Sequence, residues 1–95
     1  MIKVKARKGQ ITVNGHAGYA ASGSDIVCAG VSVLFQAMLR AVQDVAADHI
    51  AFKIAPGEAE MTYDKLSETG MAMVDSFFTG IVMMAEEYPE YVRII

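Results

Sequence analysis

Two long helical patterns are separated by short stretches in which apolar and polar residues alternate. The first pattern covers residues 25 to about 47, with Ser24 or Asp25 as its N-cap. The second covers residues 65 to 88, where Pro89 ends it. A chain of 95 residues is the size of one domain with a modest core. Both helices must therefore share that core with the strands.

The alternating stretches predict two hairpins and a closing strand. Residues 2–7 alternate apolar and basic side chains, and residues 11–14 follow a plausible turn at Gly9-Gln10. Residues 50–55 and 58–64 flank Pro56-Gly57 as a second hairpin, and residues 90–95 form the last strand. The order ββαββαβ predicts a single α+β domain over residues 1–95, in which the two long helices cover a largely antiparallel sheet.

A helical wheel of the first helix separates two faces. The predicted core stripe consists of Val27, Val31, Leu34, Met38, Val42 and Val45. The opposite, polar stripe consists of Asp25, Cys28, Ser32, Gln36, Arg40 and Gln43. The chain's single cysteine therefore falls among polar residues, although a free cysteine is usually buried as a small hydrophobe.

Charge and composition exclude several classes of protein. One cysteine cannot form an internal disulfide, and the basic, alternating start is not a signal peptide. The most apolar run, residues 71–85, carries Asp75 and is shorter than the ~20 residues of a membrane span. A net charge of −3 argues against direct nucleic-acid binding and suits a basic protein partner. We expect a cytoplasmic protein with neither membrane nor nucleic acid as partner.

The stretch GHAGYAASGSDIVCAGVS, residues 15–32, brings together the residues with the most chemistry. Cys28 lies in the first helical turn, where the helix dipole favours the thiolate. A glycine-rich loop could fold back to place His16 beside it as a general base. Asp25 could orient the imidazole of His16 through a ring N–H. The alternative is that Cys28 and His16 are packing residues.

A metal site is a weak interpretation of the same residues. Cys28 and His16 supply two ligands, without a C-x-x-C or H-x-x-x-H pattern to complete a tetrahedral site. His49, at the end of the first helix, is better explained as a solvated residue or one that pairs with the helix dipole. We expect neither a metal nor a cofactor.

Gly15-His16-Ala17, the short loop, Asp25-Ile26-Val27-Cys28-Ala29 and Ser32 together resemble the ribosomal-processing cysteine protease Prp family. The resemblance extends over essentially the whole chain by length and element order. It implies that His16 is the catalytic base and Cys28 the nucleophile, with Asp25 and Ser32 in supporting positions. It also implies a homodimer.

The substrate implied by the resemblance is large-subunit ribosomal protein L twenty-seven. Its N-terminal extension would be removed by a cut after an apolar, aromatic motif. Two other functions remain open from the residues: a non-catalytic ribosome- or protein-binding module, and a hydrolase of acyl or thioester substrates. The second helix carries a wide apolar arc that serves as core, dimer face or part of a substrate pocket: Leu66, Met73, Val74, Phe77, Phe78, Ile81, Met84 and Tyr88.

Overall fold

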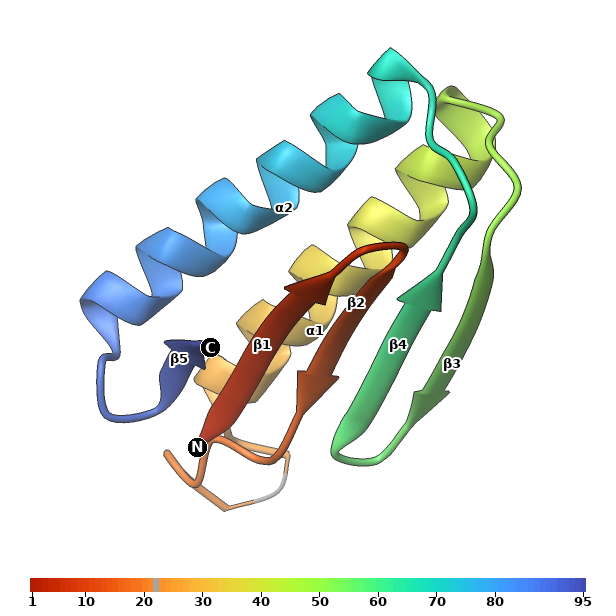
Figure 1. The fold of residues 1–95 in the computed structure, drawn as a ribbon. Coiled ribbons are helices and arrows are strands. Elements are labelled where there is room, and N and C mark those ends of the chain that lie inside the picture. Colours follow the sequence, from red (N-terminus) through yellow and green to blue (C-terminus); the bar gives the residue numbers. More distant parts are fainter. Residues whose placement is uncertain (22) are drawn as a thin grey trace.

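The computed structural model describes residues 1–21 and 23–95. Over these residues the elements are β1 (Ile2–Arg7), β2 (Gln10–Asn14), α1 (Ile26–Arg40), the π-helical segment η1 (Ala41–Val45), β3 (Ala51–Ala55), β4 (Glu58–Thr62), α2 (Glu68–Glu87) and β5 (Val92–Ile94). Because η1 continues α1, the predicted order ββαββαβ is confirmed (Figure 1).

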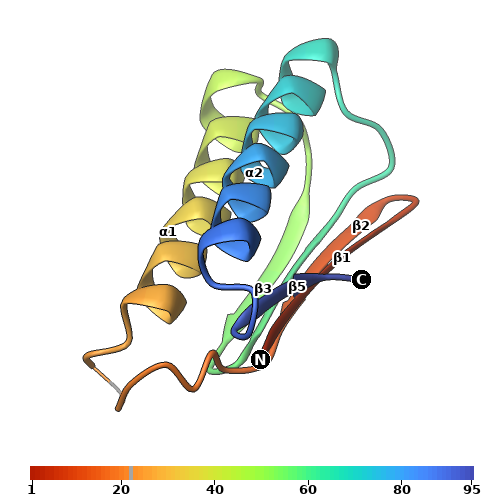
Figure 2. The same cartoon turned by 90° about the vertical axis from the view of Figure 1, so that its left-hand side faces the viewer.

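The strands form one mixed sheet in the order β3-β4-β2-β1-β5. The pairs β1–β2, β2–β4 and β3–β4 are antiparallel, and β1–β5 is parallel. Both helices lie on one face of this sheet (Figure 2). The α+β class and the largely antiparallel sheet are therefore confirmed. Lys3, Lys5 and Arg7 alternate with the buried Val4 on β1, which places them on the face opposite the helices.

The core lies between the helices and the sheet, and it corrects the predicted stripe of α1. Val27, Val31, Met38 and Val42 are buried as predicted, and Phe35 and Leu39 are buried with them. Leu34 is half-buried instead, because it turns toward α2: a Cβ on Gly80 would stand 2.7 Å from one of its methyl groups. Phe35 faces the core, where its ring packs edge-on against that of Phe77 with the two ring centroids 5.9 Å apart.

Val45 is the second error in the predicted stripe, since it is 66% exposed. It ends η1, where i→i+5 hydrogen bonding adds about one residue to the turn and rotates the following side chains. The regular 3.6-residue period used for the prediction therefore fails there. The continuous helix Ile26–Val45 is long and apolar enough to span a membrane, a test that the core helices of soluble proteins also pass.

Capping side chains set both helix starts. Asp25 is the N-cap of α1, one of the two predicted candidates. The second helix begins at Glu68, three residues later than predicted, because the Ser67 side chain caps it by accepting a hydrogen bond from the Gly70 N–H at 3.0 Å.

Candidate active site

Cys28 lies in the first turn of α1 as a half-buried residue. Asp25 Oδ1 accepts hydrogen bonds from the backbone N–H groups of Val27 and Cys28, at 3.0 and 2.9 Å. The Cys28 Sγ in turn accepts a hydrogen bond from the Ala17 N–H at 3.2 Å. A backbone donor and the positive end of a helix both stabilise negative charge on sulfur. The sulfur is therefore held at the start of α1 by a contact from the residue that follows His16.

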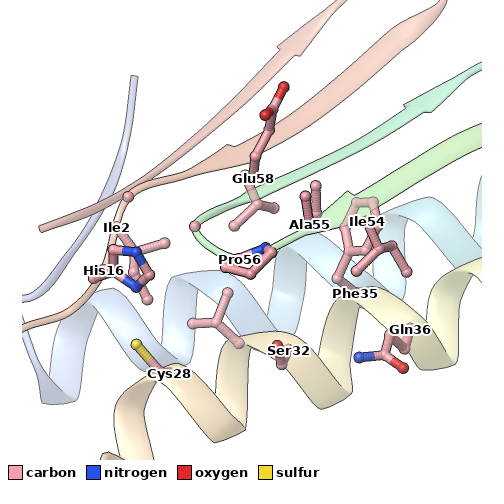
Figure 3. Close-up of a pocket in the computed structure, with 15 residues that line it drawn as sticks. Ile2, His16, Cys28, Ser32, Phe35, Gln36, Ile54, Ala55, Pro56 and Glu58 are labelled. Atoms are coloured by element: carbon pink, nitrogen blue, oxygen red, sulfur yellow. The ribbon is translucent and has the colours of Figure 1, made fainter. Parts of the chain in front are cut away.

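His16 follows β2 and reaches the same place from the other side. The Gly15 N–H donates to the carbonyl oxygen of Gly57 at 2.9 Å, which ties the end of β2 to the β3–β4 turn. The His16 ring packs on that turn. Figure 3 shows the imidazole facing the sulfur of Cys28. The structure thus brings together the two residues that the sequence predicted as a pair.

A pocket opens between α1, the end of β2 and the β3–β4 turn. His16 and Cys28 lie at one end of it, and Ser32 and Gln36 follow Cys28 along α1 (Figure 3). Apolar side chains form much of the remaining lining: Ile2, Val13, Val31, Phe35, Ile54 and Pro56. The cavity measures about 180 Å³. This is well short of the roughly 300–1,000 Å³ typical of small-molecule sites. It suits one or two side chains of a peptide.

Asp25 does not have the predicted role of orienting His16. Besides capping α1 through Oδ1, it uses Oδ2 to accept hydrogen bonds from the Tyr19 and Ala20 N–H groups at 3.1 and 3.4 Å. Among the described residues, no hydrogen bond joins Asp25 to His16. The carboxylate instead fastens the loop after His16 to the start of α1. Ser22, in the same loop, lies outside the described residues.

The hydrogen bonds to Asp25 also set its acidity. The Cys28 N–H lowers the pKa of the Asp25 carboxyl below its ordinary value most strongly, desolvation opposes this, and the Ala20, Tyr19 and Val27 N–H groups lower it further. Because folding lowers this pKa, the stabilising contribution of the carboxylate is present above its ordinary value of 3.8. That contribution is lost as the pH falls through the folded-state pKa.

Replacing Asp25 by asparagine should separate its two tasks. Asparagine caps a helix about as well as aspartate, so at pH 7 the melting temperature should fall only by what the charge of the carboxylate contributes, which is less than in Asp25→Ala. While its single side-chain oxygen caps the helix, the NH₂ group that takes the place of Oδ2 can accept from neither Tyr19 nor Ala20. Loop amides should therefore exchange faster, and turnover should fall roughly 10- to 100-fold. Asp25→Ala should lose the cap as well and lower the Tm by a few degrees. Wild-type hydrogen exchange and turnover in Asp25→Asn would show that the loop does not depend on the carboxylate.

Ser32 lines the pocket as an exposed side chain, as its place on the polar stripe suggested. Two other contributions to this site, from Ala17 and Gly57, were not predicted from the sequence. The Ala17 N–H, however, is a backbone group that no side-chain pattern reveals. Gly57 carried a signal only as part of a Pro-Gly turn, which says nothing of the ring packed against it.

Substituting Gly57 should impair the site more than it impairs the fold. A Cβ there would stand 2.6 Å from His16 Nε2, and the backbone φ of +71° disfavours any side chain. Gly57→Ala should cost more than about 1 kcal/mol of stability and lower kcat per folded molecule at least tenfold. Gly9→Ala is the matched control. Gly9 lies in the distant β1–β2 turn with φ +74°, and a Cβ added there would stand 2.7 Å from the backbone oxygen of Tyr63. Equal kcat in the two folded variants would contradict this role of Gly57.

No group of three or more His, Cys, Asp or Glu side chains in residues 1–21 and 23–95 is placed to hold a metal ion. The pocket offers the thiol of Cys28, the imidazole of His16 and the backbone N–H of Ala17. Such a set can attack a carbonyl carbon and move the associated protons.

The family model described as "Cysteine protease Prp" matches residues 1–93. The chain belongs to the Prp family of cysteine proteases. No curated protein sequence matches it significantly. The Prp ribosomal processing protease of Staphylococcus aureus, crystallised with a covalently linked product peptide, is similar in structure with a TM-score of 0.87 and 19% sequence identity. That match covers 98% of this chain and 94% of the other.

Two further solved structures share the Prp fold. SMU.848 from Streptococcus mutans has a TM-score of 0.78 and 27% identity, with 98% of this chain and 89% of that one covered. The S. aureus Prp protease in complex with a substrate peptide has a TM-score of 0.77 and 17% identity, with 99% and 95% covered. These likenesses confirm the fold. The family model confirms the Prp family assignment that residues 15–32 suggested.

Proposed function

We propose that this chain is a cysteine endopeptidase in which Cys28 is the nucleophile and His16 the general base. The observation that carries the proposal is the meeting of these two side chains at one end of a pocket that suits one or two side chains of a peptide (Figure 3). Membership of the Prp cysteine protease family supports it. The two residues come from separate elements, and the Gly15–Gly57 and Ala17–Cys28 hydrogen bonds keep them together.

In the proposed mechanism the imidazole of His16 takes the proton of the Cys28 thiol as the sulfur attacks the scissile carbonyl carbon. The imidazolium then donates that proton to the departing amine, which leaves a thioester on Cys28. A water molecule loses a proton to the imidazole and attacks the thioester. The carboxylate product departs and the sulfur regains a proton.

The Ala17 N–H is the proposed donor to the oxyanion of the tetrahedral intermediate. Asp25 already occupies the N–H groups of Val27 and Cys28, whereas the Ala17 N–H points at the sulfur that will carry the new bond. When the sulfur attacks, negative charge moves from the sulfur to the carbonyl oxygen. The Ala17 N–H can then donate its hydrogen bond to that oxygen instead of to the sulfur.

We propose that the substrate is the precursor of a large-subunit ribosomal protein of the L twenty-seven type, cut after an apolar, aromatic N-terminal motif. The description of the S. aureus relative as a ribosomal processing protease supports this substrate class. The net charge of −3 favours encounter with a basic ribosomal protein. We propose that the enzyme acts in the cytoplasm as a homodimer.

The test is incubation of the purified protein with a peptide that spans the N-terminal extension, followed by mass spectrometry of the products. One cut directly after the apolar motif is expected. Binding without cleavage would overturn the proposal in favour of a protein-binding module. Hydrolysis of small thioesters without cleavage of the peptide would favour an acyl hydrolase.

A further inference from the structure

Beyond the catalytic end of the pocket, α1 and the edge strand β3 face each other. Ser32 and Gln36 lie on the α1 side, and Ile54 lies on the β3 side (Figure 3). Phe52 precedes Ile54 by two residues, so the two side chains share one face of the strand. Their cross-strand partners are Met61, which is fully buried, and Ala59. Both side chains therefore point to the helix side of the sheet.

This helix-side position does not cover them. Phe52 is 52% exposed and Ile54 is 49% exposed, although both are large and apolar. In the described part of the chain, β3 pairs with β4 on one side and with no strand on the other. An edge strand with uncovered apolar side chains readily accepts another extended segment.

The spacing of Phe52 and Ile54, and their continuity with the pocket, suit an extended peptide. Alternate residues of any extended peptide lie about 6.6–6.8 Å apart, the same interval that separates Phe52 from Ile54 along β3. Ile54 also lines the pocket that contains Cys28. An extended peptide that reaches the sulfur can therefore continue along β3 and place two alternate side chains on these residues. Gln36, opposite, offers an uncharged amide to the peptide backbone.

We propose that Phe52 and Ile54 form the specificity wall for the substrate, binding two alternate apolar or aromatic side chains on the N-terminal side of the cut. This inference rests on the proposed peptidase function. It names residues of β3 as the source of the preference for an aromatic motif, whereas the catalytic pair supplies the chemistry.

The experiment compares two peptides, one with the aromatic motif and one with alanine in its place, on Phe52→Ala, Ile54→Ala and the wild type. Each variant should lower kcat/KM for the aromatic peptide at least tenfold, mainly through KM, and reduce the preference over the alanine peptide. Met83→Ala is the control, because Met83 is a 64% exposed apolar residue of α2 that belongs neither to the pocket lining nor to β3. It should keep the wild-type preference.

A binding measurement separates this inference from the proposed function. In a Cys28→Ala background, fluorescence anisotropy with the labelled aromatic peptide should show at least tenfold weaker binding for both β3 variants than for Met83→Ala. Unchanged affinity in the β3 variants overturns the specificity wall even if the wild type cleaves. Weaker binding with no cleavage by the wild type supports the wall and overturns the peptidase.

Discussion

Replacing Cys28 by alanine is expected to reduce cleavage of the extension peptide to the uncatalysed background while the protein stays folded. The change removes the chain's single thiol, so no other sulfur can form the thioester. The side chain is small and half-buried, so its loss should cost within ~1 kcal/mol. Cleavage is followed by mass spectrometry of the products and stability by thermal unfolding.

Phe35→Ala gives the contrasting result for a residue of the core. Phe35 is 2% exposed and packs on Phe77, so its truncation should cost ~3–5 kcal/mol. A Cys28→Ala protein that cleaves as fast as the wild type would end the peptidase account. A Cys28→Ala protein that unfolds, combined with an inactive wild type, would show that Cys28 is a packing residue.

Replacing His16 by alanine is expected to lower kcat by about 10²–10⁴-fold, the usual contribution of a general base. The fold should persist because the His16 side chain is exposed. Turnover rates and circular dichroism of the variant check both expectations.

His49 provides the matched control for this substitution, since it is the chain's other histidine and lies with Lys8, Ile50 and Tyr63 away from Cys28. His49→Ala should keep the wild-type rate. Similar losses in the two variants would show that the effect is not specific to the pocket.

Local signals in the sequence were sufficient to predict the element order and the candidate pair. Alternation identified the strands, and an aspartate before an apolar period identified the start of α1, because both signals act within a few residues. The His16 and Cys28 pairing needed the loop to fold back. The glycines of the loop favoured this prediction, because glycine readily adopts positive φ. In the structure Gly18 and Gly23 both do so.

The parts that the sequence did not predict depend on contacts between distant elements. A helical wheel has no information about η1 or the position of α2, so it misplaced Leu34 and Val45. Asp25 carries one carboxylate that could serve His16 or the loop, and the loop geometry decided the outcome. Phe52 is 52% exposed on the edge strand β3, and neither the position of β3 in the sheet nor this exposure can be read from its strand pattern.

The most direct test of the central account is the intact mass of the enzyme after acid quenching during turnover of the extension peptide. The account predicts a species heavier by the mass of the N-terminal fragment less one water, and fragmentation should locate it on Cys28. The species should be absent in Cys28→Ala and form more slowly in His16→Ala. Cleavage of the peptide by the wild type with the adduct on another residue would contradict the account.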